Sequence, residues 1–338
     1  MKKTTIKDIA RELGVNPSTV SRALNNHPDI GLAMRAEVKQ LAEKMHYRPN
    51  QTAVHLRSQQ SRLIGLIVPE MTMFFYPSVI KGIQEALDKK GYHLVMLSSN
   101  ESAEQEMENL RICVENDLAG VLISLSRNTK IPANLNLLSE LDAPVVLFDK
   151  VLNDMPFDSI LLADERAAQD SVLHLIHSGC TRIGGMFGNP NLLMTQLRMK
   201  GFLKGLELGG VPFIEQLVRF ADNAIDGAQC ARELMSLPEQ PDGIFVMSDE
   251  LIIGAYPPIC NAGLAIPQEC SVICISDGFL PYLLYPQVTY LHHDGYEMGK
   301  TAAERLLSRI SNQSSQFEPE TLYIQAKLIE CASTQKVK

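Results

Sequence analysis

The chain has 338 residues, of which 45% are hydrophobic and 21% are charged. This composition is typical of a soluble globular protein, and the length predicts two or three compact units, each with its own core. No apolar stretch reaches the ~20 residues that cross a bilayer, and the charged N-terminus lacks a signal-peptide core, so we expect a cytoplasmic protein that binds no membrane. The seven cysteines include no CxxC pair, which indicates buried thiols and no zinc site.

The net charge of -8 is unevenly distributed along the chain. Residues 1–61 carry ten Lys or Arg and five Asp or Glu, a net charge of +5, which leaves -13 for the remainder. We therefore expect a polyanion to bind at the basic head and to be repelled by the acidic body.

The head, residues 1–49, shows the pattern of three short helices. The apolar side chains of the first helix share one face and are Ile6, Ile9, Ala10 and Leu13. Gly14 then ends this helix, while Asn16 as N-cap and Pro17 at the first helical position begin the second. About three residues join the two helices, which is the spacing of a helix-turn-helix unit. A third helix, predicted over 32–45, closes the small core.

The second helix is predicted to read double-stranded DNA. Its N-terminal side chains enter the major groove in this motif, so Pro17, Ser18 and Arg22 are predicted to face bases. The side chains placed for phosphate contacts are Thr5, Thr19, Ser21 and Asn25. The alternative is a three-helix bundle whose polar face is only solvated, and the positive charge of the head favours DNA binding.

Residues 50–61 are predicted to form a hinge between head and body. The Arg48-Pro49 pair favours extended chain, and Asn50 can cap a helix that begins after it. Residues 51–57 make barely two helical turns, which is too short for a helix that is stable alone in water. We interpret this segment as a linker that folds only against a partner.

The body, residues 62–338, alternates short apolar runs with helical stretches. Strands are predicted over 63–68, 94–97, 121–125, 145–148, 160–163, 183–187, 244–247 and 272–275. Amphipathic helices are predicted between most of them, for example over 79–89, 167–177 and 197–208. This alternation predicts parallel sheets covered by helices on both faces, and the number of strands favours two sheets with a cleft between them. The predicted fold is therefore a helix-turn-helix head, a hinge helix and a two-lobed, doubly wound α/β body.

Four of the predicted strands end in a carboxylate, at Asp149, Asp164, Asp249 and Asp277. Ligands of doubly wound sheets bind at the carboxyl ends of the strands, so we expect these aspartates to line the cleft. The alternative for each is that it only caps the next helix.

Both parts of the chain resemble the LacI/GalR family of bacterial repressors. In the head and hinge the resemblance runs through TIKDIA (5–10), GVNPSTVSRALN (14–25) and YRPN (47–50), followed by Ala53, Leu56 and Arg57. In the body it runs through LIGLIVP (63–69), RMKGF (198–202), Ser248, Asp249, Gly254, Ala255, Gly263, Ile266 and Pro267. The chain departs from the family pattern at Gly31, Met34, Met73, Phe74, Glu165, Cys180 and Ser276.

The resemblance implies a homodimer whose recognition helices read two half-sites of operator DNA while paired hinge helices enter the minor groove. Leu56 would then be the apolar wedge between base steps, with Asn50 and Ala53 at the hinge contact. The alternative for Leu56 is a linker leucine that packs on the sensor. The C-terminus has no leucine heptad, so we expect a dimer and not a tetramer.

The resemblance also implies a sensor, similar to periplasmic sugar-binding proteins, for a small sugar-like effector. Arg198 would pair with the aspartates and donate hydrogen bonds to sugar hydroxyls. The remaining predicted contacts are Phe74, Phe75 and Tyr76, one of which would stack a ring on the sugar, together with Ser276 and Asp277. The alternative for the aromatic residues is that they only seal a core.

Two other functions compete with that of a regulator. A transport-type sugar-binding protein would share the sensor fold, but it would need an export signal and would have no use for a basic head. An enzyme would need a reactive motif, and the sequence has no phosphate loop, HExxH or nucleophile elbow. Ser78 and Lys81 match SxxK, which is frequent by chance, and His292 and His293 are interpreted as part of a chain crossing between lobes. We expect no catalytic residue, cofactor or metal.

Overall fold

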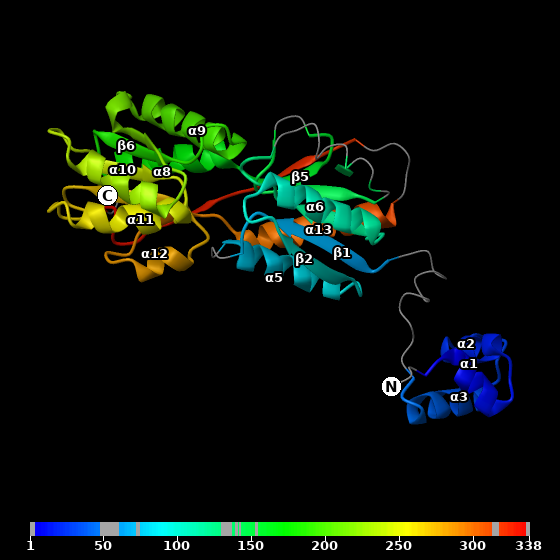
Figure 1. The fold of residues 1–338 in the computed structure, drawn as a ribbon. Helices are drawn as coiled ribbons and strands as arrows, with labels where there is room; N and C mark the ends of the chain where they lie inside the picture. Colours follow the sequence, from blue (N-terminus) through cyan, green and yellow to red (C-terminus); the bar gives the residue numbers. More distant parts are fainter. Residues whose placement is uncertain are drawn as a thin grey trace. The chain divides into compact units, whose positions relative to one another are not determined.

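The computed structural model describes residues 4–47, 61–71, 75–129, 137–138, 141, 143–152, 155–312 and 318–335. The chain divides into two compact units, Met1–Ser61 and Arg62–Lys338 (Figure 1). The predicted contact residues Asn50, Ala53, Leu56 and Phe74 lie outside the described residues. Among the described residues, no helix is both long enough and apolar enough to span a membrane.

The first unit is a bundle of three helices, α1 (Ile6–Leu13), α2 (Pro17–Leu24) and α3 (Leu32–Lys44). Gly14 ends α1 with a left-handed backbone (φ 64°), and the Asn16 side chain accepts a hydrogen bond from the Ser18 amide at the start of α2. The buried side chains between the helices are Ile9, Ala10, Val20, Ala23, Val38 and Ala42. The start and stop signals of the first two helices therefore act as the sequence predicts.

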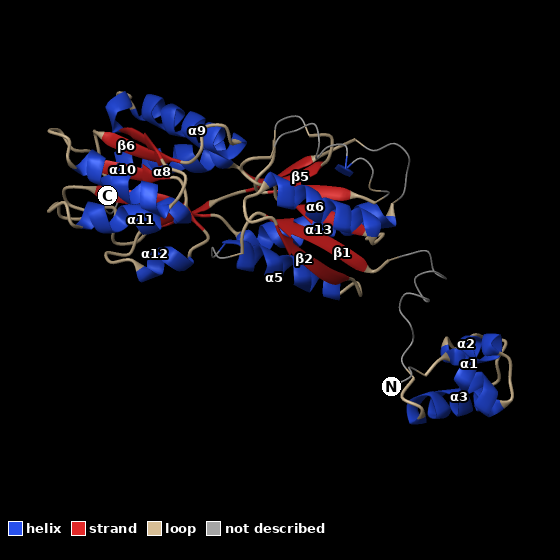
Figure 2. Ribbon diagram, viewed as in Figure 1, coloured by secondary structure: helices blue, strands red, loops and turns tan. Residues whose placement is uncertain are grey.

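The second unit contains two six-stranded sheets, each covered by helices (Figure 2). The first lobe has the strand order β11-β5-β4-β3-β1-β2, and all its strands run parallel. Its strands are β1 (Leu63–Val68), β2 (His93–Ser98), β3 (Gly120–Ile123), β4 (Val145–Phe148), β5 (Asp158–Leu162) and β11 (Thr321–Ile324). Its helices are α5 (Phe75–Asp88), α6 (Ala103–Glu115) and α13 (Gly295–Ser311).

The second lobe has the strand order β12-β10-β9-β8-β6-β7, and β12 runs antiparallel to β10. Its strands are β6 (Ile183–Phe187), β7 (Val218–Phe220), β8 (Gly243–Val246), β9 (Ser271–Ser276), β10 (Thr289–His292) and β12 (Lys327–Ile329). Its helices are α8 (Asp164–His177), α9 (Leu193–Gly209), α10 (Ala224–Met235), α11 (Asp249–Cys260) and α12 (Phe279–Leu283), with a 3-10 turn at Glu215–Leu217. The predicted two-lobed, doubly wound fold is confirmed.

Within the described residues, the chain passes between the lobes at three places. β5 leads into α8, β10 leads into α13, and β11 leads into β12. His292 ends β10 and His293 is the next residue, so this histidine pair lies at a crossing, as predicted.

The structure corrects several predicted bounds. α5 begins at Phe75 and not at residue 79, β3 ends at Ile123 and not at residue 125, and β5 begins at Asp158 and not at residue 160. The strands β7, β10, β11 and β12 were not predicted. Three of them lie at sheet edges with half-exposed side chains, so they lack the continuous apolar run that marks a buried strand.

A buried ion-pair network ties α13 to the sheet of the first lobe. Asp158 is fully buried and accepts hydrogen bonds from Arg305 Nε at 2.8 Å and Arg309 Nε at 2.7 Å. The backbone amide of Glu320, just before β11, donates to the same carboxylate at 2.9 Å. Burial alone would raise the pKa of Asp158, but hydrogen bonds from Arg309 and Arg305 lower it to about 2.

We expect Asp158→Asn to lower the free energy of unfolding by about 3 kcal/mol at pH 7, because Arg305 and Arg309 lose the charge of the buried carboxylate that they share, while Arg305 keeps a pair with the exposed Glu320. The pKa of Asp158 is lower in the folded than in the unfolded chain, so its stabilising effect is present above about pH 4 and is lost as the pH falls toward 2. Denaturant unfolding at pH 7 and pH 3 should therefore show a smaller deficit at pH 3.

The matched control is Asp170→Asn, which removes an exposed pair with Arg166. This control should change the unfolding free energy by less than about 0.5 kcal/mol. Equal losses from the two variants at pH 7 would contradict a special role for Asp158.

Candidate functional site

The second helix of the head presents a polar face to solvent. Ser18, Arg22 and Asn25 are exposed, and their spacing of four and then three residues places them on one side of α2. Val20 and Ala23, on the opposite side, are fully buried. Of the other residues predicted to contact DNA, Thr5 and Pro17 are exposed, and Thr19 and Ser21 are half-buried.

Some of the predicted phosphate donors have partners within the head. The Thr5 hydroxyl donates to the Asp8 carboxylate at 2.6 Å, and the Asn25 side-chain amide donates to the Ser21 carbonyl at 2.9 Å. The Thr5 hydroxyl has one proton and must leave Asp8 to donate to a phosphate oxygen, whereas the Asn25 amide has a second N–H for such a contact. The exposed Arg22 guanidinium is the side chain of this face best suited to a base, because its planar fork matches the acceptors of guanine.

The four strand-end aspartates lie where the sheets predict, and both lobes contribute. Asp149 directly follows β4 of the first lobe, and Asp277 directly follows β9 of the second. Asp164 and Asp249 are the first residues of α8 and α11. The Asp277 carboxylate accepts a hydrogen bond from the Phe279 amide at the start of α12, although Gly278 and not Asp277 is the N-cap of that helix.

Arg198 of α9 is a fully buried charge held by two partners. Its Nε donates to Asp164 at 2.6 Å, and its Nη1 donates to the Met247 carbonyl at 2.5 Å. A side chain at Gly201 would meet the Glu165 carbonyl oxygen at 2.0 Å, so glycine is required for α9 to pack this closely on α8. The close packing brings Arg198 within reach of the residue that begins α8.

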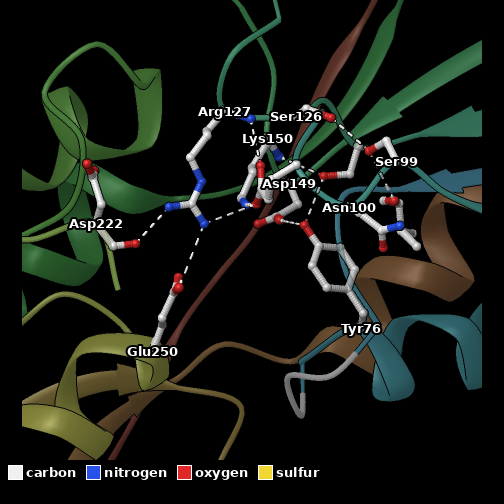
Figure 3. Close-up of polar contacts among 12 residues, drawn as sticks. Tyr76, Ser99, Asn100, Ser126, Arg127, Asp149, Lys150, Asp222 and Glu250 are labelled. Carbon is white, nitrogen blue, oxygen red and sulfur yellow. Dashed lines mark hydrogen bonds and ion pairs between the residues drawn. The ribbon is translucent and has the colours of Figure 1, made fainter. Parts of the chain in front are cut away.

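Of the predicted aromatic contacts that the structure describes, Tyr76 is buried and Phe75 is half-buried. Tyr76 is 5% exposed, and its hydroxyl donates to Asp149 at 2.8 Å and lies 3.1 Å from the Ser124 hydroxyl (Figure 3). The Phe75 ring lies 4.3 Å from the His293 ring, centroid to centroid. Asp149 has a left-handed backbone (φ 59°), which is strained for a residue other than glycine and typical of functional sites.

Three buried side-chain atoms among the described residues have no hydrogen-bond partner: Arg198 Nη2, Asp249 Oδ1 and His293 Nε2. The charge of Arg198 acts on the pKa of both Asp249 and His293, so the three side chains lie in one electrostatic neighbourhood. Buried polar atoms normally have partners, because an unmade hydrogen bond costs the desolvation of the group. We call Asp149, Asp164, Arg198, Asp249 and His293 the Arg198 cluster.

Burial sets the protonation of this cluster. It raises the pKa of Asp249 to about 6, although hydrogen bonds from Ser276 and from the Asp277 amide oppose the shift. Burial, together with the charge of Arg198, holds the pKa of His293 well below its usual value, so this imidazole is neutral. The cluster therefore offers a charged donor, carboxylate acceptors and a neutral imidazole, which suits a neutral ligand with several hydroxyl groups.

A second polar group adjoins this cluster and was missed in the sequence (Figure 3). Lys150 Nζ lies 2.5 Å from Glu101, and Arg127 Nη2 lies 3.3 Å from Glu101 and 3.7 Å from Glu250. Lys150 directly follows a predicted aspartate at a strand end, so the strand-end rule extended by one residue would have found it. Among the described residues, no group of three or more His, Cys, Asp or Glu side chains could hold a metal ion.

Two family models match this chain. Residues 5–50 match the model of bacterial regulatory proteins of the lacI family, and residues 172–334 match that of the periplasmic binding protein-like domain. The ribose operon repressor of Bacillus subtilis (strain 168) is 31% identical over 310 residues, which cover 91% of this chain and 92% of that protein. The HTH-type transcriptional regulator RegA of Clostridium saccharobutylicum is 28% identical over 334 residues, 98% of this chain and 99% of that protein.

Solved structures share the fold at lower sequence identity. The Lac repressor dimer bound to operator and the anti-inducer ONPF has a TM-score of 0.88 and 22% identity, with 99% of this chain and 100% of that chain covered. The transcriptional regulator CelR in its cellobiose complex has a TM-score of 0.74 and 23% identity, with 98% and 100% covered.

We expect Asp249→Asn to stabilise the chain at pH 7.5 by about 2 kcal/mol. The pKa of Asp249 is higher in the folded than in the unfolded chain, so the contribution to stability is present below about pH 4 and is lost as the pH rises through about 6. Ionising the buried Asp249 therefore costs stability at pH 7.5. Asparagine removes this cost, because it is neutral, and it keeps the shape of the side chain and the oxygen that accepts from the Asp277 amide.

Urea unfolding at pH 7.5 and at pH 4 measures this effect, and the gain should disappear at pH 4. Glu207→Gln on the exposed face of α9 is the control and should show no gain at either pH. A variant no more stable than the wild type at pH 7.5 would show that the ionised Asp249 carries no folding cost.

Proposed function

The chain belongs to the LacI family of bacterial regulatory proteins, and we propose that it is an operator-binding regulator controlled by a neutral sugar bound at the Arg198 cluster. We place the DNA-binding head at residues 1–49, the hinge at 50–61 and the sensor at 62–338. The three unpartnered buried atoms of the Arg198 cluster carry the effector part of this proposal.

The head supports sequence-specific binding to double-stranded DNA. Its second helix exposes Ser18, Arg22 and Asn25 on one face, and the head carries the positive charge that phosphates attract. The acidic sensor would be repelled by DNA, which restricts binding to the head. This division of charge favours a regulator over a transport-type sugar-binding protein.

The sensor supports a small, neutral and polyhydroxylated effector. Arg198 Nη2 is a donor and Asp249 Oδ1 an acceptor, which is the pair that vicinal hydroxyls satisfy. Asp149 lies within the electrostatic reach of Arg198, and Asp277 within that of Asp249, so a phosphorylated sugar would place its charge near three acids, which opposes an anion. We propose no catalytic role for the cluster.

An apolar surface on the second lobe supports a homodimer. Exposed aromatic and aliphatic side chains gather on and just after α12, and they are Phe279 (54% exposed), Tyr282 (57%), Leu283 (65%) and Tyr285 (90%). A patch of this kind marks an interaction surface in a soluble protein. A second copy of the chain is the partner that two operator half-sites require. A regulator of this kind works in the cytoplasm, where the operator lies.

We expect Arg22→Ala to weaken operator binding by about 1–3 kcal/mol per half-site and to relax the preference at one base pair, as a lost guanine contact does. Selection of operator sequences followed by fluorescence anisotropy at fixed salt measures both effects. Arg11→Ala, which removes an exposed arginine from α1, should keep the selected sequence. Unchanged affinity and unchanged base preference in Arg22→Ala would remove this residue from direct readout.

We expect at least one sugar in a panel of neutral mono- and disaccharides, D-ribose and cellobiose included, to raise the unfolding temperature of the full chain. A hundredfold excess over the dissociation constant corresponds to about 2.7 kcal/mol of stabilisation. Asp249→Asn should weaken binding of that sugar by about 1–3 kcal/mol, because a hydroxyl acceptor loses its charge, and its operator complex should no longer respond to the sugar. Asp170→Asn is the exposed control and should respond as the wild type does. A variant Asp249→Asn with normal sugar affinity would place the effector elsewhere.

A further inference from the structure

Arg127 lies on the loop after β3, and two carboxylates of the first lobe fix this loop. Glu106 is fully buried and accepts hydrogen bonds from the Ser126 amide at 2.6 Å and the Thr129 hydroxyl at 2.9 Å. Glu101 accepts from the backbone amide of Arg127 itself at 2.8 Å. The backbone of Arg127 is therefore held by its own lobe, and its side chain extends from a fixed base.

The Arg127 side chain contacts the second lobe. Its Nη1 donates to the Asp222 carbonyl at 2.7 Å, just before α10, and its Nη2 lies 3.7 Å from the Glu250 carboxylate in the first turn of α11 (Figure 3). The same Nη2 lies 3.3 Å from Glu101 of the first lobe. One guanidinium thus joins both lobes, and we call these contacts the Arg127 bridge. The side chain is 20% exposed, so salt screens the bridge less than a surface ion pair.

When the lobes separate, the contacts of Arg127 within the first lobe remain, and its contacts with the second lobe are lost. Lys150 and Arg127 lower the pKa of Glu101 against the effect of burial, so this acid keeps two cationic partners within its own lobe. Burial raises the pKa of Glu250, and Arg127 is the main group that opposes this shift. Opening would therefore leave the first-lobe half assembled and return Glu250 and the Asp222 carbonyl to water. A bridge built in this way can break and re-form without unfolding either lobe.

The bridge lies beside the Arg198 cluster in both lobes. Lys150, which shares Glu101 with Arg127, directly follows Asp149 in the first lobe, and Glu250 directly follows Asp249 in the second. A movement of the lobes that takes Glu250 away from Arg127 carries the neighbouring Asp249 with it. Asp149 stays with the neighbouring Lys150, which shares Glu101 with Arg127, so the distance between Asp249 and Asp149 increases as well. The state of the bridge and the spacing of the cluster therefore change together.

We propose that Arg127 is a positioning residue that holds the two lobes together in the effector-free chain. Where the effector is the sugar of the proposed function, only molecules with the bridge formed present both halves of its site. The apparent dissociation constant is then the intrinsic constant divided by the fraction of bridged molecules. The arrangement of the lobes can be measured without any sugar. The proposal for Arg127 can therefore fail while the proposed function holds, and the two outcomes are distinguishable.

The test is an interlobe distance, measured by pulsed electron paramagnetic resonance on the effector-free full-length chain. Spin labels are attached at Glu115→Cys on α6 and Glu207→Cys on α9, both exposed, in a background where the half-exposed Cys260 and Cys331 are serine. An excess of unlabelled chain is added, so that few dimers carry labels on both protomers and the measured distance lies within one chain. We expect one main distance in this parent chain and, in Arg127→Met, a longer distance whose population is about tenfold higher.

Two further variants keep the result specific. Glu250→Gln removes the acid of the second lobe and leaves the Asp222 contact, so it should increase the longer distance less than Arg127→Met does, and the double variant should not exceed Arg127→Met alone. Arg219→Met breaks an ion pair with Glu233 inside the second lobe and should keep the parent distance. Parent-like distances in both Arg127→Met and Glu250→Gln, or an equal change in Arg219→Met, would overturn the proposal.

Discussion

The sensor depends on one buried charge, the guanidinium of Arg198. A cation with 2% exposure is tolerated only when its donors find acceptors, and Asp164 and the Met247 carbonyl supply two of them. The close packing of α9 on α8, permitted by Gly201, brings the first of these partners into range. The remaining donor, Nη2, has no acceptor among the described residues. The fold that buries the charge therefore also leaves a donor that a ligand oxygen could satisfy. The fold and the proposed binding site thus arise from the same constraint.

The Arg198 cluster costs stability that other parts of the chain offset. Asp149 holds a left-handed backbone, and Asp249 is ionised at neutral pH against the effect of its burial. The first lobe gains from Asp158, whose carboxylate is fully used by two arginines of α13. This contrast separates two kinds of buried acid. Both oxygens of Asp158 accept hydrogen bonds and support the fold, whereas Oδ1 of Asp249 has no partner among the described residues, which a ligand hydroxyl would supply.

The sequence predicted the fold class and the positions of the strand-end acids because both depend on local pattern. Apolar runs alternating with helices determine a doubly wound sheet, and the sheet then places Asp149 and Asp249 at carboxyl ends. His293 and Arg127 were not predicted as site residues, because their roles depend on the directions of side chains that meet across the two lobes. Tyr76 was one of three candidates for a stacking ring, and that role stays a prediction; the bond of its hydroxyl to Asp149 could not be predicted from the sequence. The hinge contacts at Asn50, Ala53 and Leu56 stay predictions.

A sugar changes operator affinity only through a difference in its affinity for two arrangements of the sensor. The Arg198 cluster draws residues from both lobes, so a ligand bound there would favour the arrangement that holds the lobes together. The Arg127 bridge favours that same arrangement before any ligand arrives, because it joins Glu101 of the first lobe to Glu250 of the second. A stronger bridge means that more molecules already hold their lobes together without sugar, so the sugar can raise that fraction less. Within the described part of the chain, Arg127 makes one hydrogen bond to the second lobe, to the Asp222 carbonyl at 2.7 Å, and its 3.7 Å contact with Glu250 is longer than a hydrogen bond. Such a bridge stabilises the joined lobes by a small amount and leaves the sugar a difference in free energy to supply.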